Sequence, residues 1–172
     1  MGAEYMTADR RVASTRPDVR VYQGEVLKHE LTLEGPSEME LHVSTTGTDA
    51  DWVVKVIDVY PDDFPDADPN PTGVKMGGYQ QLIRGEPFRG KFRNSFEKPE
   101  AFKPYEPTTI KFTLQDVCHV FRPGHRLMIQ IQSSWFPLFD RNPQTFCDIY
   151  TAHVHDFQFT AQRVYRSPDH PT

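Results

Sequence analysis

The stretch "DWVVKVIDVY", residues 51–60, decides the fold class of this chain. Its apolar residues occupy alternate positions, with Trp52, Val54 and Val56 on one face of an extended strand and Val53, Ile57 and Val59 on the other. A strand that is apolar on both faces is typical of the centre of a packed sheet. The stretch therefore predicts a buried central β-strand.

Period-two alternation recurs on both sides of this strand, in "ELTLEG" (30–35), "EMELHVS" (38–44) and "TIKFTL" (109–114). In "HRLMIQIQSS" (125–134) we expect Leu127, Ile129 and Ile131 to face a core, and Gln130 and Gln132 to face the other way. The only helical signal is a short turn at 143–152 with Pro143 in its first turn. Fifteen prolines and ten glycines separate short strands, which predicts an all-β sandwich with Greek-key or jelly-roll crossings.

The composition suits one globular domain, with 172 residues of which 37% are hydrophobic and 25% charged. We place this domain at residues 9–172 and interpret residues 1–8 as a linker remnant or the start of an excised segment. The net charge is −5 and the basic residues form no stripe along the sequence, so a nucleic-acid partner is not expected. No apolar run approaches the roughly 20 residues that a membrane-spanning helix needs, so no membrane partner is expected.

Cys118 and Cys147 are the only cysteines, so the sequence permits at most one disulfide within the chain. We interpret both as buried thiols, and whether they pair stays open. A nucleophilic Cys118 would need a base, and the neighbouring His119 would point to the opposite face of an extended strand.

Two clusters are candidate metal sites. "DADPN" (66–70) copies the opening of a calcium-binding loop, but Pro71 and Gly77 stand where that loop needs a glycine and a glutamate. "HVHD" (153–156) would place two imidazoles on one face of a strand, as in small β-barrel metalloenzymes, but no glutamate ligand follows. We therefore predict no metal and no cofactor, with the metalloenzyme as the open alternative.

Serine catalysis is not supported by the sequence. The elbow G-x-S-x-G is absent, and Ser133 and Ser134 run into "WFP", which leaves no helix N-terminus for an oxyanion hole. The chain taken alone therefore has no predicted catalytic residue.

The segment "SSWFPLFDRNPQTF" (133–146) is a loop by its prolines yet rich in aromatic residues. Such a loop either closes one end of the protein's own core or serves as a binding surface. Trp135 with Asp140, Arg141 and Asn142 would suit a sugar platform, which makes a carbohydrate-binding module the alternative function. The same three polar residues would equally form a side-chain-to-backbone turn network.

Four ordered blocks resemble a known family: "TTGTDADWVVKVIDVYP" (45–61), "IRGEPFRGKFRNSFEKPE" (83–100), "FRPGHRLMIQIQSSWFPLFDRNPQT" (121–145) and "QRVYRSPDHP" (162–171). They are similar to the C-terminal domain of bacterial serine hydrolases that include cocaine esterase, α-amino acid ester hydrolase, glutaryl cephalosporanic acid acylase and X-prolyl dipeptidyl peptidase. The resemblance implies a galactose-binding-domain-like jelly roll that follows an α/β-hydrolase catalytic domain and a helical cap. The catalytic serine, aspartate and histidine of the family lie in that catalytic domain, so none is carried over here.

The expected partner is then the catalytic domain, which this chain lacks, and the parent enzyme would hydrolyse acyl esters, amides or X-prolyl peptides. The expected interface comprises an exposed apolar patch with a charged rim: Phe92, Arg93, Phe96, Trp135, Phe136, Phe139, Asp140, Arg141 and Asn142. Without its partner, this patch would favour self-association of the chain. The compartment stays open, because a signal peptide would precede the catalytic domain; a periplasmic or secreted parent is one expectation.

Overall fold

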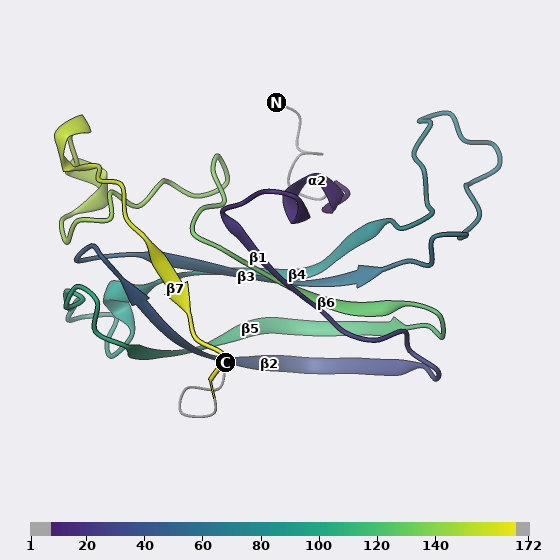
Figure 1. Ribbon diagram of the computed structural model, residues 1–172, viewed down its shortest axis with the longest axis horizontal. Coiled ribbons are helices and arrows are strands. Elements are labelled where there is room, and N and C mark those ends of the chain that lie inside the picture. The colour runs from purple at the N-terminus through teal and green to yellow at the C-terminus, as the bar shows by residue number, and fades with distance from the viewer. Residues whose placement is uncertain (1–7, 168–172) are drawn as a thin grey trace. The chain divides into compact units, whose positions relative to one another are not determined.

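The computed structural model describes residues 8–167, and its strands form two antiparallel sheets of a β-sandwich (Figure 1). The predicted linker remnant therefore falls almost entirely outside the described residues, as does the end of the "QRVYRSPDHP" block. One sheet has the order β1–β6–β3–β4, and the other has the order β5–β2–β7. The strands are β1 (Val19–Gln23), β2 (Leu31–Thr45), β3 (Asp51–Val59), β4 (Gln80–Arg89), β5 (Thr108–Phe121), β6 (Arg126–Gln132) and β7 (Gln162–Val164).

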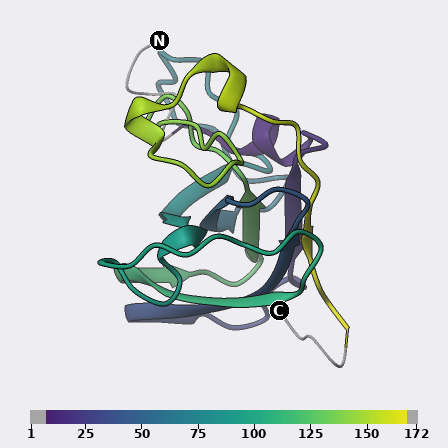
Figure 2. The ribbon, with the colours of Figure 1, turned by 90° about the vertical axis from the view of Figure 1, so that its left-hand side faces the viewer.

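The strand β3 confirms the prediction made from residues 51–60, because all of its residues are buried. Alternation is also confirmed in β2 and β5, which run side by side in their sheet (Figures 1 and 2). Leu41 and Val43 of β2 and Ile110 and Leu114 of β5 are buried. The all-β prediction is therefore correct.

The predicted facing of β6 is correct for Ile131, which is buried, and wrong for the residues before it. Met128 and Gln130 are buried, whereas Leu127 and Ile129 are only partly buried. Gln130 is tolerated inside because its amide nitrogen lies 3.4 Å from Gln80 Oε1 and 3.7 Å from the Met128 sulfur. Apolar residues lie on both faces of this strand, so alternation alone does not identify the more buried face.

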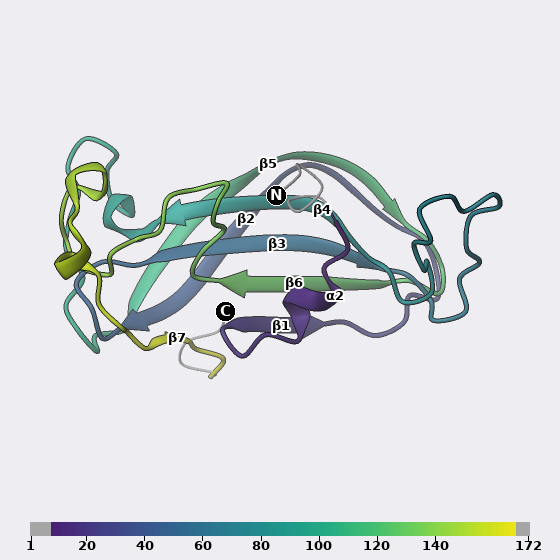
Figure 3. The same ribbon diagram turned by 90° about the horizontal axis from the view of Figure 1, so that it is seen from above.

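The chain divides into two compact units, each drawn from separated parts of the sequence. The first contains residues 8–36, 54–86 and 115–132 among those described. In it β1 pairs with β6 from Val19 opposite Gln132 to Gln23 opposite Met128, and Figure 3 shows these two strands side by side. Ile57, Val59 and Met128 form a core cluster there.

The second unit contains residues 37–53, 87–114 and 133–167 among those described. The end of β2 pairs with β7, with Val43 opposite Val164 and Thr45 opposite Gln162. Aromatic packing supports this unit, since the Trp52 and Phe102 ring centroids lie 5.4 Å apart and Phe88 stacks on Phe112 at 4.8 Å.

Helical structure in the described residues is limited to short pieces. These are α2 (Arg11–Ser14) and the 3₁₀ turns η1 (Gly90–Phe92), η2 (Ile149–Thr151) and η3 (Val154–Asp156). The helical turn predicted at 143–152 is thus reduced to η2. Within residues 8–167 no helix has the length and apolar character needed to cross a membrane. The single domain at 9–172 stays a prediction.

Candidate functional site

The connection between β2 and β3, residues 45–51, anchors several loops of the second unit. Its sequence "TTGTDAD" is mostly buried. The carbonyl of Thr48 accepts a hydrogen bond from the Phe102 amide at 2.8 Å, and the Thr48 hydroxyl accepts one from the Phe146 amide at 2.8 Å. Residues distant in the sequence are therefore held on one short segment.

Asn142 joins this connection to the aromatic loop 133–142. Its amide nitrogen donates to Asp49 Oδ2 at 3.1 Å and to Asp51 Oδ1 at 2.7 Å. Its Oδ1 accepts from the Gln144 amide at 2.8 Å. Asn142 is buried, so the turn-network interpretation of this residue is supported and the sugar-platform interpretation is not.

The two aspartates beneath Asn142 are in an unusual electrostatic setting. Burial raises the pKa of Asp51 to about 6, although the Asn142 amide and Arg89 both oppose the shift. Burial raises the pKa of Asp49 as well. Arg89 Nη1 lies 3.1 Å from Asp51 Oδ2, and both aspartates are compensated in part by the charges of Arg89 and Lys91 and by the shared Asn142 amide.

Trp135 is the main correction to the predicted interface. Its side chain is only 8% exposed, so it is not available as a stacking platform or as a surface anchor. The carbonyl of Trp135 accepts from the Leu138 amide at 2.9 Å, and its ring lies 6.3 Å from that of Phe139. The indole is therefore turned inward, which contradicts its place in the expected interface and agrees with the alternative in which the loop closes part of the protein's own core.

The remaining predicted loop residues are exposed. Phe136 and Phe139 are 47% and 40% exposed, and the Arg141 guanidinium lies 4.5 Å from the centre of the Phe136 ring. Asp140 is also exposed, and its carbonyl lies 3.5 Å from Arg89 Nη2. These four side chains are accessible at the surface, and their role as an interface stays a prediction.

The arm 92–102 exposes the aromatic side chain of Phe96, and hydrogen bonds from Arg93 fix its backbone. Arg93 donates to the carbonyls of Glu100 at 2.8 Å and Ala101 at 3.0 Å, and its guanidinium lies 4.3 Å from the centre of the Phe102 ring. Arg93 therefore joins the start of the arm to its end, while Phe96 between them is 82% exposed. The Phe92 ring lies 6.1 Å from that of Phe96.

The loop 144–161 has an exposed apolar surface that was not predicted from the sequence, which indicated only a helical turn at 143–152 and the "HVHD" cluster there. Figure 2 shows it as a projecting loop with two short helical turns. Its exposed apolar side chains are Phe146, Tyr150, Val154, Phe157 and Phe159. The available signal was the recurrence of aromatic residues at 146–159 without strand alternation.

The candidate metal clusters do not assemble. Within residues 8–167 no group of three or more His, Cys, Asp or Glu side chains is arranged to hold a metal ion. Asp66 instead accepts from the Met76 amide at 2.8 Å and pairs with Lys75. His153 and His155 stack at 5.4 Å in and beside the 3₁₀ turn η3, so the predicted strand for "HVHD" is wrong.

Both cysteines are free thiols, and Cys118 is exposed, which contradicts its predicted burial. Cys118 falls on the outward face of β5, between buried Val117 and partly buried His119. In the first unit, His119 Nε2 lies 2.9 Å from Asp58 Oδ2, and His125 Nδ1 lies 2.8 Å from Asp58 Oδ1. This buried His–Asp–His group was not foreseen, because its members are remote in sequence.

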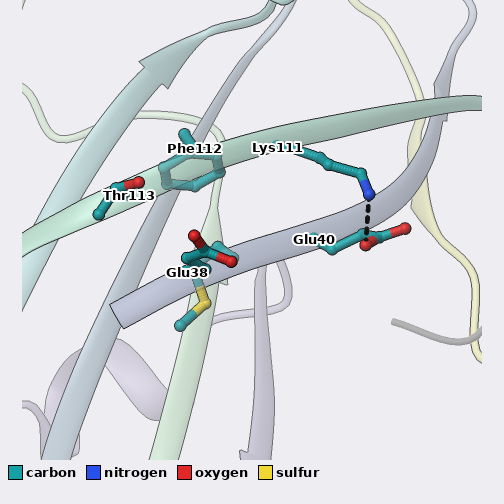
Figure 4. A pocket seen from close by; sticks show the side chains of 6 residues that line it. Glu38, Glu40, Lys111, Phe112 and Thr113 are labelled. Carbon is teal, nitrogen blue, oxygen red and sulfur yellow. Dashed lines mark ion pairs between the residues drawn. The ribbon is translucent and has the colours of Figure 1, made fainter. Parts of the chain in front are cut away.

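A cavity of about 400 Å³ lies beside β2 and β5 in the second unit (Figure 4). Glu40 and Lys111 at its edge form an ion pair of 2.8 Å, and Lys111 lowers the pKa of Glu40. This ion pair is largely exposed, and the remaining charged side chain of the lining is the exposed Glu38, so the cavity offers no buried charged group to a ligand.

The fold and the loop surface are those of an accessory β-sandwich domain. Residues 3–172 match the family model described as the X-Pro dipeptidyl-peptidase C-terminal non-catalytic domain, and the chain belongs to that family.

Three relatives place the domain in longer proteins. Cocaine esterase from Rhodococcus sp. (strain MB1 Bresler) is 29% identical over 96% of this chain and 26% of its own length. An aminopeptidase from a marine sediment archaeon, Thaumarchaeota archaeon, has a TM-score of 0.89 at 44% identity, over 98% of this chain and 27% of its own. A selenomethionine-labelled α-amino acid ester hydrolase has a TM-score of 0.87 at 42% identity, over 96% of this chain and 26% of its own. The chain thus spans about a quarter of the length of these relatives.

Proposed function

We propose that this chain is the non-catalytic C-terminal domain of a serine hydrolase that acts on acyl esters, amides or X-prolyl peptides. It packs on the catalytic α/β-hydrolase domain and helps to shape the entrance to the active site. The observation that supports this most is the exposed surface of Phe136, Phe139, Arg141 and Phe96, held in place by the connection 45–51.

The interface has the chemistry of a domain contact within one polypeptide. Aromatic side chains and arginine are enriched at the centre of such interfaces, with charge toward the rim. Trp135 and Asn142 belong to this proposal as supports beneath the surface, because both are buried. Arg93 likewise shapes the arm through backbone carbonyls.

An assay of the purified chain tests the proposal. We expect no hydrolysis of p-nitrophenyl esters or of an X-prolyl anilide above background, because the sequence lacks the serine elbow. Turnover that survives further purification and disappears in Ser133→Ala or Ser134→Ala would overturn it. The reading frame upstream of this chain should encode a G-x-S-x-G-type elbow followed by an aspartate and a histidine.

A further inference from the structure

The loop 144–161 exposes its apolar side chains to an unusual degree. Tyr150, Val154 and Phe159 are 83%, 92% and 109% exposed, and Phe146 and Phe157 are 39% and 47% exposed. Large apolar side chains grouped in this way on one loop mark a surface that binds another apolar surface.

These side chains do not hold the loop in shape, because polar contacts do so. The Thr145 hydroxyl donates to the Asp156 carbonyl at 2.8 Å, and the Gln158 amide donates to the Pro143 carbonyl at 2.9 Å. At the far end, the Ala161 amide donates to the Thr46 hydroxyl at 3.0 Å. The loop is therefore tied across its middle and at its base while its apolar groups point outward.

The acidic side chains of the loop are engaged within it. Asp148 Oδ1 accepts from the Tyr150 amide at 3.1 Å, and Asp156 Oδ2 accepts from the His153 amide at 2.8 Å. The side chains that remain for a partner are the exposed apolar ones together with the uncharged or weakly basic Thr151, His153, His155 and Gln158. Because the backbone is already fixed, little conformational entropy would be lost when this face is covered.

The loop continues the interface proposed above. The Gln144 carbonyl accepts a hydrogen bond from the Thr48 amide at 3.2 Å, and the Gln144 amide donates to Asn142 Oδ1. The loops 133–142 and 144–161 are therefore both anchored on the connection 45–51. The relatives carry this domain as 26–27% of their length, which leaves about three-quarters of such a polypeptide to supply a covering surface.

We infer that the face of Tyr150, Val154, Phe157 and Phe159 is a docking surface for the catalytic part of the same polypeptide, and that the matching surface there is apolar. This inference rests on the proposed function. It extends the interface to a loop that the sequence had indicated only as a helical turn and a candidate metal cluster.

Hydroxyl-radical footprinting of the isolated chain and of the full-length polypeptide tests the inference. Labelling of Tyr150 and Phe159 should fall about tenfold in the full-length polypeptide, because an interface core takes a side chain from almost full exposure to a few per cent. In the full-length polypeptide, Tyr150→Ser with Phe159→Ser should remove the protection of Phe157, whereas the control Val120→Ser, on a strand of the first unit, should not.

The outcomes separate this inference from the proposed function. Protection of Phe136 and Phe139 with full labelling of Tyr150 and Phe159 overturns the inference and leaves the proposed function standing. Full labelling of all four side chains overturns both. The isolated chain is labelled at a concentration at which it is monomeric. Protection in the full-length polypeptide that disappears when that polypeptide is diluted to a monomer identifies a second copy as the occupant, and also overturns the inference.

Discussion

Asn142 illustrates what one residue does at this site and why the sequence could not disclose all of it. The motif "FDRN" indicates a turn, and Asn142 does accept the Gln144 amide as such a turn requires. Its other role depends on Asp49 and Asp51, which lie on a different part of the chain. Long-range partners of this kind have no local sequence signature.

The raised pKa of Asp51 predicts how stability varies with pH. Its pKa is about 6 in the folded protein, against an ordinary value of 3.8, because the carboxyl is buried. Between these values the folded state binds a proton that the unfolded state has released, so stability falls as pH rises from about 4 through about 6. The contribution is complete below the lower value and is lost above the higher one.

Asp51→Asn should flatten this dependence, because the amide cannot titrate. We expect the total fall in unfolding free energy over this range to be smaller by roughly 2–3 kcal/mol in the variant, with a smaller pH dependence left by Asp49. Urea unfolding at a series of pH values measures it. Asp63→Asn, in an exposed loop position, is the control and should keep the wild-type slope. An Asp51→Asn profile parallel to wild type would contradict the raised pKa.

Trp135 and Phe136 are adjacent, yet the structure predicts opposite consequences for their removal. Trp135→Ala should cost about 3–5 kcal/mol of stability, as for a buried aromatic, because the side chain is 8% exposed. Phe136→Ala should cost about 0.5 kcal/mol or less as a surface change. Thermal unfolding of both variants checks this, and equal losses would show that the loop has a different inward face.

At the scale of elements, prediction succeeded where one pattern dominated. In β3 every residue is buried, including the polar Asp51, Lys55 and Asp58. Alternation is regular over residues 32–43 of β2 and over residues 108–115 of β5, so these strands could be identified. It failed for β6, where apolar residues occupy both faces, and for Cys118, whose face of β5 is set by the register of Val117. Burial of Trp135 depends on the turn at Leu138, which the prolines alone do not determine.

The connection 45–51 is an element without regular structure, and Gly47 shows how closely its neighbours approach. A Cβ at this position would overlap the Gln144 carbonyl and lie 2.8 Å from the Thr160 side chain. Because backbone atoms cannot yield as a flexible side chain can, the loop 144–161 would have to move away.

Gly47→Ala should therefore destabilise the chain by about 1–3 kcal/mol through overpacking. It should also loosen the loop, which hydrogen exchange at the Phe146 amide would report. The matched control is Gly24→Ala, where the nearest atom to the added Cβ is the Leu127 carbonyl oxygen at 3.4 Å. Wild-type exchange at Phe146 in Gly47→Ala would mean that the connection does not hold the loop.

At the scale of the whole molecule, the exposed apolar loops have a physical consequence for the isolated chain in solution. The loop 144–161, the loop 133–142 and the arm 92–102 all expose apolar side chains, including Phe159, Phe136 and Phe96. The net charge of −5 opposes contact between copies at long range, but it does not remove the gain from burying apolar surface.

We therefore expect the isolated chain to self-associate through these loops as its concentration rises. Salt should strengthen the association, because it screens the repulsion between copies of like net charge and leaves the apolar contact intact. Sedimentation velocity at several protein and salt concentrations measures both effects. Tyr150→Ser with Phe159→Ser should shift the equilibrium toward monomer, whereas Val120→Ser should not. Association that weakens with salt and ignores the double substitution would place the contact on charged side chains instead.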